Sequence, residues 1–306
     1  PRLVVGDTML VCSIGIIVYN EEKNIGRLLD ALLAQELQEV FVKEIVVVSS
    51  ACRDRTDDIV RAFSQRDPRI RLIAQKEREG KSSAINLWLQ SVADGVDVCV
   101  MESGDTIPQR DTVEKLVLPF RDLDVGMTGT HPIPVNSPDT FIGFAVHLLW
   151  RLHHEIALES PKLGEMVAFR NVVSSIPPES AVDEASIEVE IRKAGLRLVY
   201  VPEAYLTNKG PENVRDFFKQ RRRIAAGHLW LREHYDYHVS TQSPGTIFST
   251  LLRCVPISGI RDLVWMAGTI FLEGLARLVG KYDYCVKKKN PFKWEIAEST
   301  KEVIKH

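Results

Sequence analysis

The chain has 306 residues, enough for one large domain with an extension or for two modest domains. Apolar residues make up 45% and charged residues 26%, as in a globular protein that buries a substantial core. The formal net charge of -2 argues against a surface built to grip nucleic acid, so we expect no nucleic-acid partner. The five cysteines are scattered and form no CxxC pair, which indicates reduced thiols in a cytoplasmic protein rather than a disulfide or zinc framework. No basic region followed by an apolar signal core occurs at the start of the sequence, and no uninterrupted apolar run reaches the length of a membrane span.

Short apolar runs, each ending in polar residues, alternate with segments whose apolar residues recur at helical spacing. This order is typical of a parallel sheet with helices on both faces. The second run is nearly all apolar, as expected for a parallel strand buried on both sides. We therefore predict an α/β fold with a mostly parallel sheet. The predicted strands are residues 12–19, 44–50, 70–74 and 96–101.

The fourth strand breaks abruptly into Glu102, Ser103, Gly104 and Asp105. A strand that ends in this way places carboxylates at the C-terminal edge of the sheet, where open α/β sheets bind ligands. We expect Asp105, alone or with Glu102, to hold a divalent cation against a phosphate. The alternative is an ordinary turn with solvated acids.

Motifs in a characteristic order carry a resemblance to a known family. The chain resembles the inverting glycosyltransferases of family two over roughly residues 12–231. The resemblance implies the GT-A fold, with a mostly parallel nucleotide-binding sheet flanked by helices, and a nucleotide-diphosphate sugar as the donor. The motifs are Asn20-Glu21-Glu22, Asp54-x-Thr56, Gly80-Lys81, Ser103-Gly104-Asp105, Asp183-Glu184 and Gln220-Arg221-Arg222-Arg223-Ile224.

The resemblance assigns the first three motifs to the nucleotide. It implies that the segment from Tyr19 through Asn20 to Glu21 lines the nucleotide pocket, although Asn and Glu here also suit the start of a helix. Many relatives carry two acids where this chain has Ser49 and Ser50, so Ser49 can contact the nucleotide only through hydrogen bonds. Asp54 is either a nucleotide contact or a helix cap. Lys81 opens a helix and is expected near the phosphates.

The later motifs are assigned to catalysis. Asp105 keeps the second acid of the family's D-x-D motif and is the expected ligand of Mg²⁺ or Mn²⁺, while Ser103 replaces the first acid. Relatives read Glu-Asp where this chain reads Asp183-Glu184, and the second position is their catalytic base. By position in the motif, Glu184 is the expected catalytic base, but the reversed order of the two acids leaves Asp183 as the alternative. The two acids can also simply stabilise the N-terminus of a helix.

The QRRRI segment matches the family's Q-x-x-R-W motif. Gln220 and Arg223 are expected near the diphosphate and the acceptor, because arginine pairs well with phosphate. Ile224 replaces the tryptophan that serves processive synthases, which favours one transfer per encounter. His228 either faces the same site or is structural. His153 and His154 are expected on the surface of a helix.

The expected organisation is a tail over residues 1–11, a GT-A-like catalytic domain over 12–211 and a helical C-terminal region over 212–306. Residues 258–280 predict an amphipathic helix. This helix either lies on a membrane, with Trp265 as an anchor and Lys287-Lys288-Lys289 near anionic headgroups, or covers the catalytic domain or a dimer interface. The first alternative places the protein at the inner face of the cell membrane and favours a lipid-linked or polysaccharide acceptor.

The expected reaction is an inverting transfer of a sugar from a nucleotide diphosphate to an acceptor hydroxyl or phosphate. One alternative is a sugar nucleotidyltransferase, which leaves Asp183-Glu184 and the QRRRI segment unexplained. The other is a non-catalytic nucleotide-sugar-binding or scaffold protein, suggested by the serines at positions 49, 50 and 103.

Overall fold

A computed structural model of the chain describes residues 8–288, apart from residues 181, 236–248, 252 and 254–258. Eight strands within this part form one sheet in the order β3-β2-β1-β4-β7-β6-β8-β5. Their bounds are β1 Leu10–Val18, β2 Val40–Ser49, β3 Ile70–Ala74, β4 Val98–Ser103, β5 Thr106–Pro108, β6 Val125–Pro134, β7 Val167–Arg170 and β8 Arg197–Asn208.

The four predicted strands form one half of this sheet. Strands β3, β2, β1 and β4 pair in parallel, and each lies within four residues of its predicted bounds. Beyond β4 the pairing is mixed, because β7 runs antiparallel to both β4 and β6, and β5 runs antiparallel to β8. The expected α/β sheet is thus confirmed, with a mixed half that the apolar runs did not predict.

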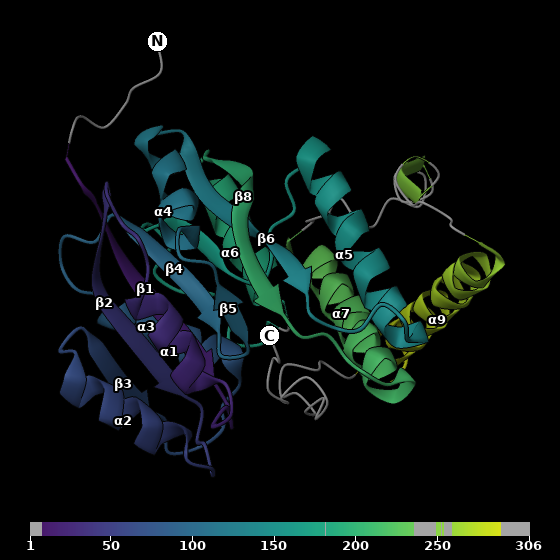
Figure 1. The fold of residues 1–306 in the computed structure, drawn as a ribbon, viewed down its shortest axis with the longest axis horizontal. Coiled ribbons are helices and arrows are strands. Elements are labelled where there is room, and N and C mark those ends of the chain that lie inside the picture. Colours follow the sequence, from purple (N-terminus) through teal and green to yellow (C-terminus); the bar gives the residue numbers. More distant parts are fainter. Residues whose placement is uncertain (1–7, 181, 236–248, 252, 254–258, 289–306) are drawn as a thin grey trace.

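Helices cover both faces of the sheet (Figure 1). In β1, β2 and β4, alternate residues enter two separate hydrophobic clusters, one on each face, because side chains alternate across a strand. Helices α1, α2 and α4 complete the first cluster, and α3 and α6 complete the second. The helix bounds are α1 Ile25–Leu33, α2 Thr56–Arg66, α3 Lys81–Ser91, α4 Thr112–Val117, α5 Phe141–Glu159, α6 Asp183–Lys193, α7 Val214–Tyr235 and α9 Ile260–Cys285.

Helices α5, α7 and α9 form a second body of structure beside the sheet (Figure 1). Ion pairs link α7 to α9, with Arg221 on Glu273 and Arg222 on Asp283. The two helices approach closely at Gly280, where an added Cβ would lie 2.5 Å from the carbonyl oxygen of Arg222. The side of α9 that carries Glu273 and Asp283 therefore faces α7.

The apolar arc of α9 faces outward. Val264, Phe271 and Leu278 are 61%, 69% and 68% exposed, and they recur every seven residues on one side of the helix. With 26 residues, α9 is also long and apolar enough to span a membrane by length and composition alone, which the search for uninterrupted apolar runs did not detect.

The expected anchoring residues of α9 lie in different places. Trp265 is half-buried and packs edge-on against Phe141 and Phe144 of α5, with ring centroids 6.3 and 5.7 Å away. Lys287 and Lys288 are exposed after the end of α9, whereas Lys289 lies outside the described residues.

Candidate active site

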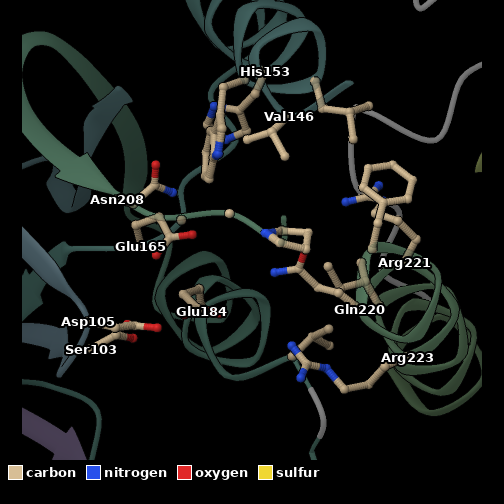
Figure 2. A pocket seen from close by; sticks show the side chains of 18 of the residues that line it. Ser103, Asp105, Val146, His153, Glu165, Glu184, Asn208, Gln220, Arg221 and Arg223 are labelled. Atoms are coloured by element: carbon tan, nitrogen blue, oxygen red, sulfur yellow. The ribbon is translucent and has the colours of Figure 1, made fainter. Parts of the chain in front are cut away.

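A cavity of about 760 Å³ lies between the C-terminal ends of β1 and β4 and helices α5, α6, α7 and α9. Figure 2 shows Ser103 and Asp105 on one side of it, Arg221 and Arg223 on the opposite side, and Glu184 between them. Segments that are far apart in the sequence thus meet at one site. The predicted residues that line the cavity are Tyr19, Glu21, Lys81, Ser103, Asp105, Glu184, Gln220 and Arg223.

Two other predicted nucleotide contacts, Asn20 and Asp54, hold two loops together behind the cavity. Asn20 has a φ of 53°, and its Oδ1 accepts a hydrogen bond of 2.9 Å from the backbone N–H of Arg53. Asp54 accepts bonds from the backbone N–H groups of Glu22 and Thr56, at 3.1 and 3.0 Å. Partial burial opposes ionisation of Asp54, but these bonds and the Thr56 hydroxyl lower its pKa. Neither side chain belongs to the cavity wall.

Ser49 is also outside the cavity wall. It is fully buried at the end of β2, and the next residue, Ser50, reaches the wall instead. Ala51 then adopts a φ of 56°, a conformation that costs a non-glycine residue energy. This turn after β2 therefore has a strained backbone that brings Ser50 to the cavity.

The loop that carries Asp105 follows directly from β4. Gly104 is required there, because a Cβ would lie 2.7 Å from Val18 and 2.9 Å from Glu21. Glu102, the suggested second metal ligand, is fully buried and accepts hydrogen bonds from the Thr106 hydroxyl and the Ser103 N–H. Burial raises the pKa of Glu102 to about 8, although these hydrogen bonds oppose the rise. The side chain that reaches the cavity is that of Asp105.

Asp183 and Glu184 begin α6 and occupy different environments. The Asp183 side chain is 1% exposed and accepts a 2.9 Å hydrogen bond from the hydroxyl of Ser82, whereas the Glu184 side chain is 23% exposed and lines the cavity. Lys81, in the first turn of α3, places its Nζ 3.4 Å from a carboxylate oxygen of each. Burial opposes the charge on Lys81, but the two acids raise its pKa above the usual value. Lys81 thereby joins the N-termini of α3 and α6.

Glu165 also lines the cavity, and no sequence motif pointed to it. It precedes β7 and has a φ of 58°, which is rare for a residue with a side chain. Burial, together with the negative charges of Asp105 and Glu184, raises the pKa of Glu165 to about 7. The unusual backbone conformation of the loop before β7 therefore places an acid in the cavity that no sequence motif predicts.

The acidic end of the cavity has more negative than positive charges. Burial lowers the pKa of Arg223 to about 9, against the attraction of four carboxylates. Lys81 and Arg223 lie among these four acids, and the carboxylates of Asp105 and Glu184 line the cavity, an arrangement that favours a bound divalent cation. No three His, Cys, Asp or Glu side chains come together as a metal site in the part of the chain that the structure describes. A metal here would therefore take Asp105 and oxygens from the substrate, an arrangement that suits Mg²⁺ or Mn²⁺. The four acids are Asp183, Glu184, Asp105 and Glu165.

The histidines on α5 are not surface residues, so that expectation is wrong. His153 is 8% exposed and lines the cavity (Figure 2). His154 stacks on His131 with ring centroids 4.0 Å apart and contacts the hydroxyl of Tyr200 at 2.8 Å. Helix α5 packs against β6 and β8, which buries this side of it.

The opposite end of the cavity, below α5 and between α7 and α9, is basic. Lys162, Arg221 and Arg277 line it, together with Glu273 and His228. Arg221 donates two hydrogen bonds to Glu273, at 2.6 and 2.8 Å, and Arg277 donates one at 2.7 Å. The Q-x-x-R-W motif points to Arg223 rather than to Arg221, which lies two residues earlier on α7.

Known proteins resemble this chain in sequence. Residues 13–169, about half of the chain, match the family model described as glycosyl transferase family 2. An N-acetylglucosaminyltransferase of Rhizobium meliloti is 26% identical over 244 residues, covering 72% of this chain and 56% of that protein. The probable glycosyltransferase YdaM of Bacillus subtilis is 22% identical, covering 72% and 55%. The chain thus spans about half the length of these curated relatives.

Solved structures have the same fold. A mannosyltransferase, PcManGT, from Pyrobaculum calidifontis, in complex with GDP-Man and Mn²⁺, superposes with a TM-score of 0.64 at 20% identity, covering 94% of this chain and 91% of that one. Glucosyl-3-phosphoglycerate synthase from Mycobacterium tuberculosis gives a TM-score of 0.51 at 16% identity, covering 77% and 82%. The GT-A fold is thereby confirmed, and the family match over residues 13–169 shows that the chain belongs to glycosyl transferase family 2.

Proposed function

We propose that this chain transfers a sugar, with inversion, from a nucleotide-diphosphate sugar to an acceptor hydroxyl. The observation that carries the proposal is the placement of Glu184, whose carboxylate opens into the same cavity as Asp105 and is paired with Lys81. An inverting transfer needs a base on the side of the sugar opposite the leaving diphosphate. Glu184 on α6 and Asp105 after β4 supply these two functions from different elements.

The reaction is a single displacement. Glu184 takes the proton of the acceptor hydroxyl as its oxygen attacks the anomeric carbon. The bond from that carbon to the diphosphate oxygen breaks, and its electron pair leaves with the nucleoside diphosphate. Asp183 is proposed as a positioning residue, because its buried carboxylate holds Lys81 and Ser82 rather than facing the cavity.

Asp105 is proposed to hold Mg²⁺ or Mn²⁺. The surplus of carboxylates around it favours a cation, and the solved mannosyltransferase with this fold contains Mn²⁺. When bound, the metal neutralises the charge that develops on the leaving diphosphate. Arg223 and Gln220 on α7 are proposed to contact the same diphosphate, because both line the cavity and Arg223 is a planar phosphate-binding group.

Tyr19 and Glu21 are proposed to contact the nucleoside. Tyr19 carries the guanidinium of Arg78 over its ring, 4.1 Å from the centroid, and all three side chains line the cavity. Asn20, Ser49 and Asp54 are proposed to act indirectly by holding the loops that frame this pocket.

A thermal-shift screen of nucleotide sugars and nucleoside diphosphates, with and without Mn²⁺, tests the donor part of the proposal. A ligand at one hundred times its Kd stabilises the folded state by about 2.7 kcal/mol through mass action. We expect one nucleotide to raise Tm, and Mn²⁺ to enlarge its effect. If no nucleotide shifts Tm, whether Mn²⁺ is present or absent, the proposal is wrong.

A non-catalytic nucleotide-sugar-binding protein is the second candidate, favoured by the loss of charge at Ser49, Ser50 and Ser103. Donor hydrolysis distinguishes the two. A transferase with an acceptor-side base releases nucleoside diphosphate slowly, with water in place of the acceptor. A chain that binds the donor tightly and releases no nucleoside diphosphate with Mg²⁺ or Mn²⁺ is a binding protein.

We further propose that the protein works in the cytoplasm at the inner face of the membrane, with the outward face of α9 on an anionic lipid surface. Apolar side chains line this face, and the exposed lysines Lys281, Lys287 and Lys288 lie near its C-terminal end. Glu273 and Asp283 point away from this face, because they are paired with arginines of α7.

A further inference from the structure

The basic end of the cavity, formed by Lys162, Arg221, Arg277 and His228, has no part in the proposed reaction. The half-buried Lys162 lines this end, and desolvation lowers the pKa of its ammonium to about 8, with Arg221 and Arg277 adding to the shift. His228 is buried, and its Nδ1 has no hydrogen-bond partner among the described residues. Burial lowers the pKa of His228 to about 3, so this ring is neutral at physiological pH. The buried Nδ1 of His228, which has no partner among the described residues, indicates a missing ligand at this end of the cavity.

The charges at the two ends of the cavity have opposite signs. Lys162, Arg221 and Arg277 carry three positive charges at the basic end, against the two negative charges of Glu273 and Glu188. The acidic end, by contrast, has four acids around two cations. An anion is therefore attracted to the basic end, and a metal ion to the acidic end.

An apolar wall adjoins the basic end. It is formed by one side of α5 and by Ile270 of α9. Ile270 is 51% exposed, so at this point the wall reaches the outer surface of the molecule, on the helix that carries the exposed apolar stripe. A hydrocarbon chain can thus lie along the wall and leave beside α9. The α5 residues of the wall are Val146, Leu148, Leu149, Leu152 and Ile156.

We infer that this end of the cavity binds an amphiphilic acceptor, with a phosphate on Lys162 and Arg221 and a hydrocarbon chain along the wall between α5 and α9. The inference rests on the proposed function and names the substrate class for it. A phosphate suits the site because the Lys162 ammonium, and the edge of the Arg221 guanidinium that is not bonded to Glu273, can form charge-assisted hydrogen bonds with its oxygens. The reacting hydroxyl of the acceptor belongs at Glu184, so the phosphate here positions the substrate and does not react.

Calorimetric titration of the full chain with octyl phosphate, octanol and inorganic phosphate tests the inference without a donor. We expect octyl phosphate to bind at least tenfold more tightly than either of the others, because only it fills both parts of the site. Across butyl, hexyl and octyl phosphate, affinity should rise by about fourfold per methylene that becomes buried. Saturating nucleoside diphosphate with Mn²⁺ should not compete, since the donor occupies the acidic end.

Two pairs of variants separate the phosphate part from the chain part. Lys162→Met should weaken octyl phosphate by about tenfold or more, whereas Lys115→Met, which removes an equal charge from α4, should not. Ile270→Gln should reduce the gain in affinity from butyl to octyl phosphate. Val264→Gln, an equally exposed position on α9 outside the cavity, should preserve it. Both Ile270 and Val264 are exposed, so these variants should fold.

Three results would overturn the inference. If octanol bound as tightly as octyl phosphate, the proposed phosphate contact would be wrong. If inorganic phosphate bound as tightly as octyl phosphate, the proposed contact with the hydrocarbon chain would be wrong. Competition by nucleoside diphosphate would assign the basic end to the donor. Each leaves the proposed transfer intact if nucleotides still raise Tm, whereas a chain that binds octyl phosphate but no nucleotide contradicts the proposed function alone.

Discussion

Lys81 Nζ lies 3.4 Å from Glu184 Oε1, and the same ammonium lies 3.4 Å from Asp183 Oδ2. One lysine at the start of α3 thus holds both candidate bases at the start of α6. Only Glu184 lines the cavity, which distinguishes two acids that are adjacent in the sequence. This difference in exposure leads to the first prediction.

Glu184→Gln should reduce kcat for donor turnover by about 10²–10⁴, the usual contribution of a general base, with little change in Tm because the side chain is at the cavity surface. Asp183→Asn should instead lower Tm, because it weakens a buried contact with Lys81, and should retain more activity. The measurements are donor hydrolysis and thermal unfolding of both variants. The reverse pattern, with Asp183→Asn inactive and Glu184→Gln active, would identify Asp183 as the base.

Asp105→Asn should abolish the extra thermal stabilisation that Mn²⁺ gives to a bound nucleoside diphosphate, because its carboxylate is the protein group available to the metal. The fold should be retained, since Asp105 lies in a loop that borders the cavity. Asp111→Asn, on the loop before α4, is the matched control and should respond to Mn²⁺ as the wild type does. Retained Mn²⁺ dependence in Asp105→Asn would remove the metal site from the proposal.

Glu273→Gln should lower the free energy of unfolding by about 3 kcal/mol at pH 7, because it leaves Arg221 and Arg277 without their shared acid. Burial opposes its charge, but the two arginines lower the pKa of Glu273 to about 2. Its stabilisation is therefore present above pH 4.5, the usual glutamate pKa, and is lost as the pH falls towards 2.

Urea unfolding of wild type and variant at pH 7 and pH 3 measures this difference. Glu190→Gln is the control, because its surface pair with Lys193 is worth at most about 1 kcal/mol. A Glu273 variant as stable as that control at pH 7 would show that the α7–α9 ion pairs do not hold these helices together.

Glu102→Gln should make stability less dependent on pH. Burial raises the pKa of Glu102 to about 8, so between pH 4.5 and pH 8 the folded protein holds a proton that the unfolded chain has lost. Stability in the wild type should therefore fall by up to about 1.4 kcal/mol per pH unit as pH rises through this window. The isosteric amide of Gln cannot titrate, so the variant should lack this fall in stability. Parallel pH slopes for wild type and variant, from urea unfolding between pH 5 and pH 8, would contradict a neutral buried Glu102.

The paired substitution of Phe271 and Leu278 by Asp should abolish flotation with anionic liposomes, because both side chains are exposed on the outward face of α9. Leu158→Asp, at a 52% exposed position on α5, is the control and should float with the wild type. A wild-type chain that stays at the bottom of the gradient would assign this face to another protein surface, and light scattering would then show whether a second copy covers it.

Local patterns were sufficient for the parallel half of the sheet. Strands β1 to β4 are apolar runs that end in polar loops, and the apolar residues of the helices between them recur every 3.6 residues. Neighbouring residues alone are therefore enough to predict these elements. The motif order predicted the family, and eight of the twelve named site residues line the cavity. The same patterns missed β5 to β8. Strands β5 and β7 have only three and four residues, and β6 and β8 contain prolines and polar residues that break an apolar run.

Other features depend on how distant segments pack. Asp183 and Glu184 are adjacent acids, and only the docking of α3 against α6 buries one and exposes the other. Glu165 enters the site through a strained loop, and the basic end exists only because α7 and α9 bring arginines beside Lys162. Amphipathicity alone predicted a helix over residues 258–280, which the structure places at Ile260–Cys285, but not that its acids would pair with arginines of α7. Contacts between segments far apart in the chain determine these features, and no local pattern encodes them.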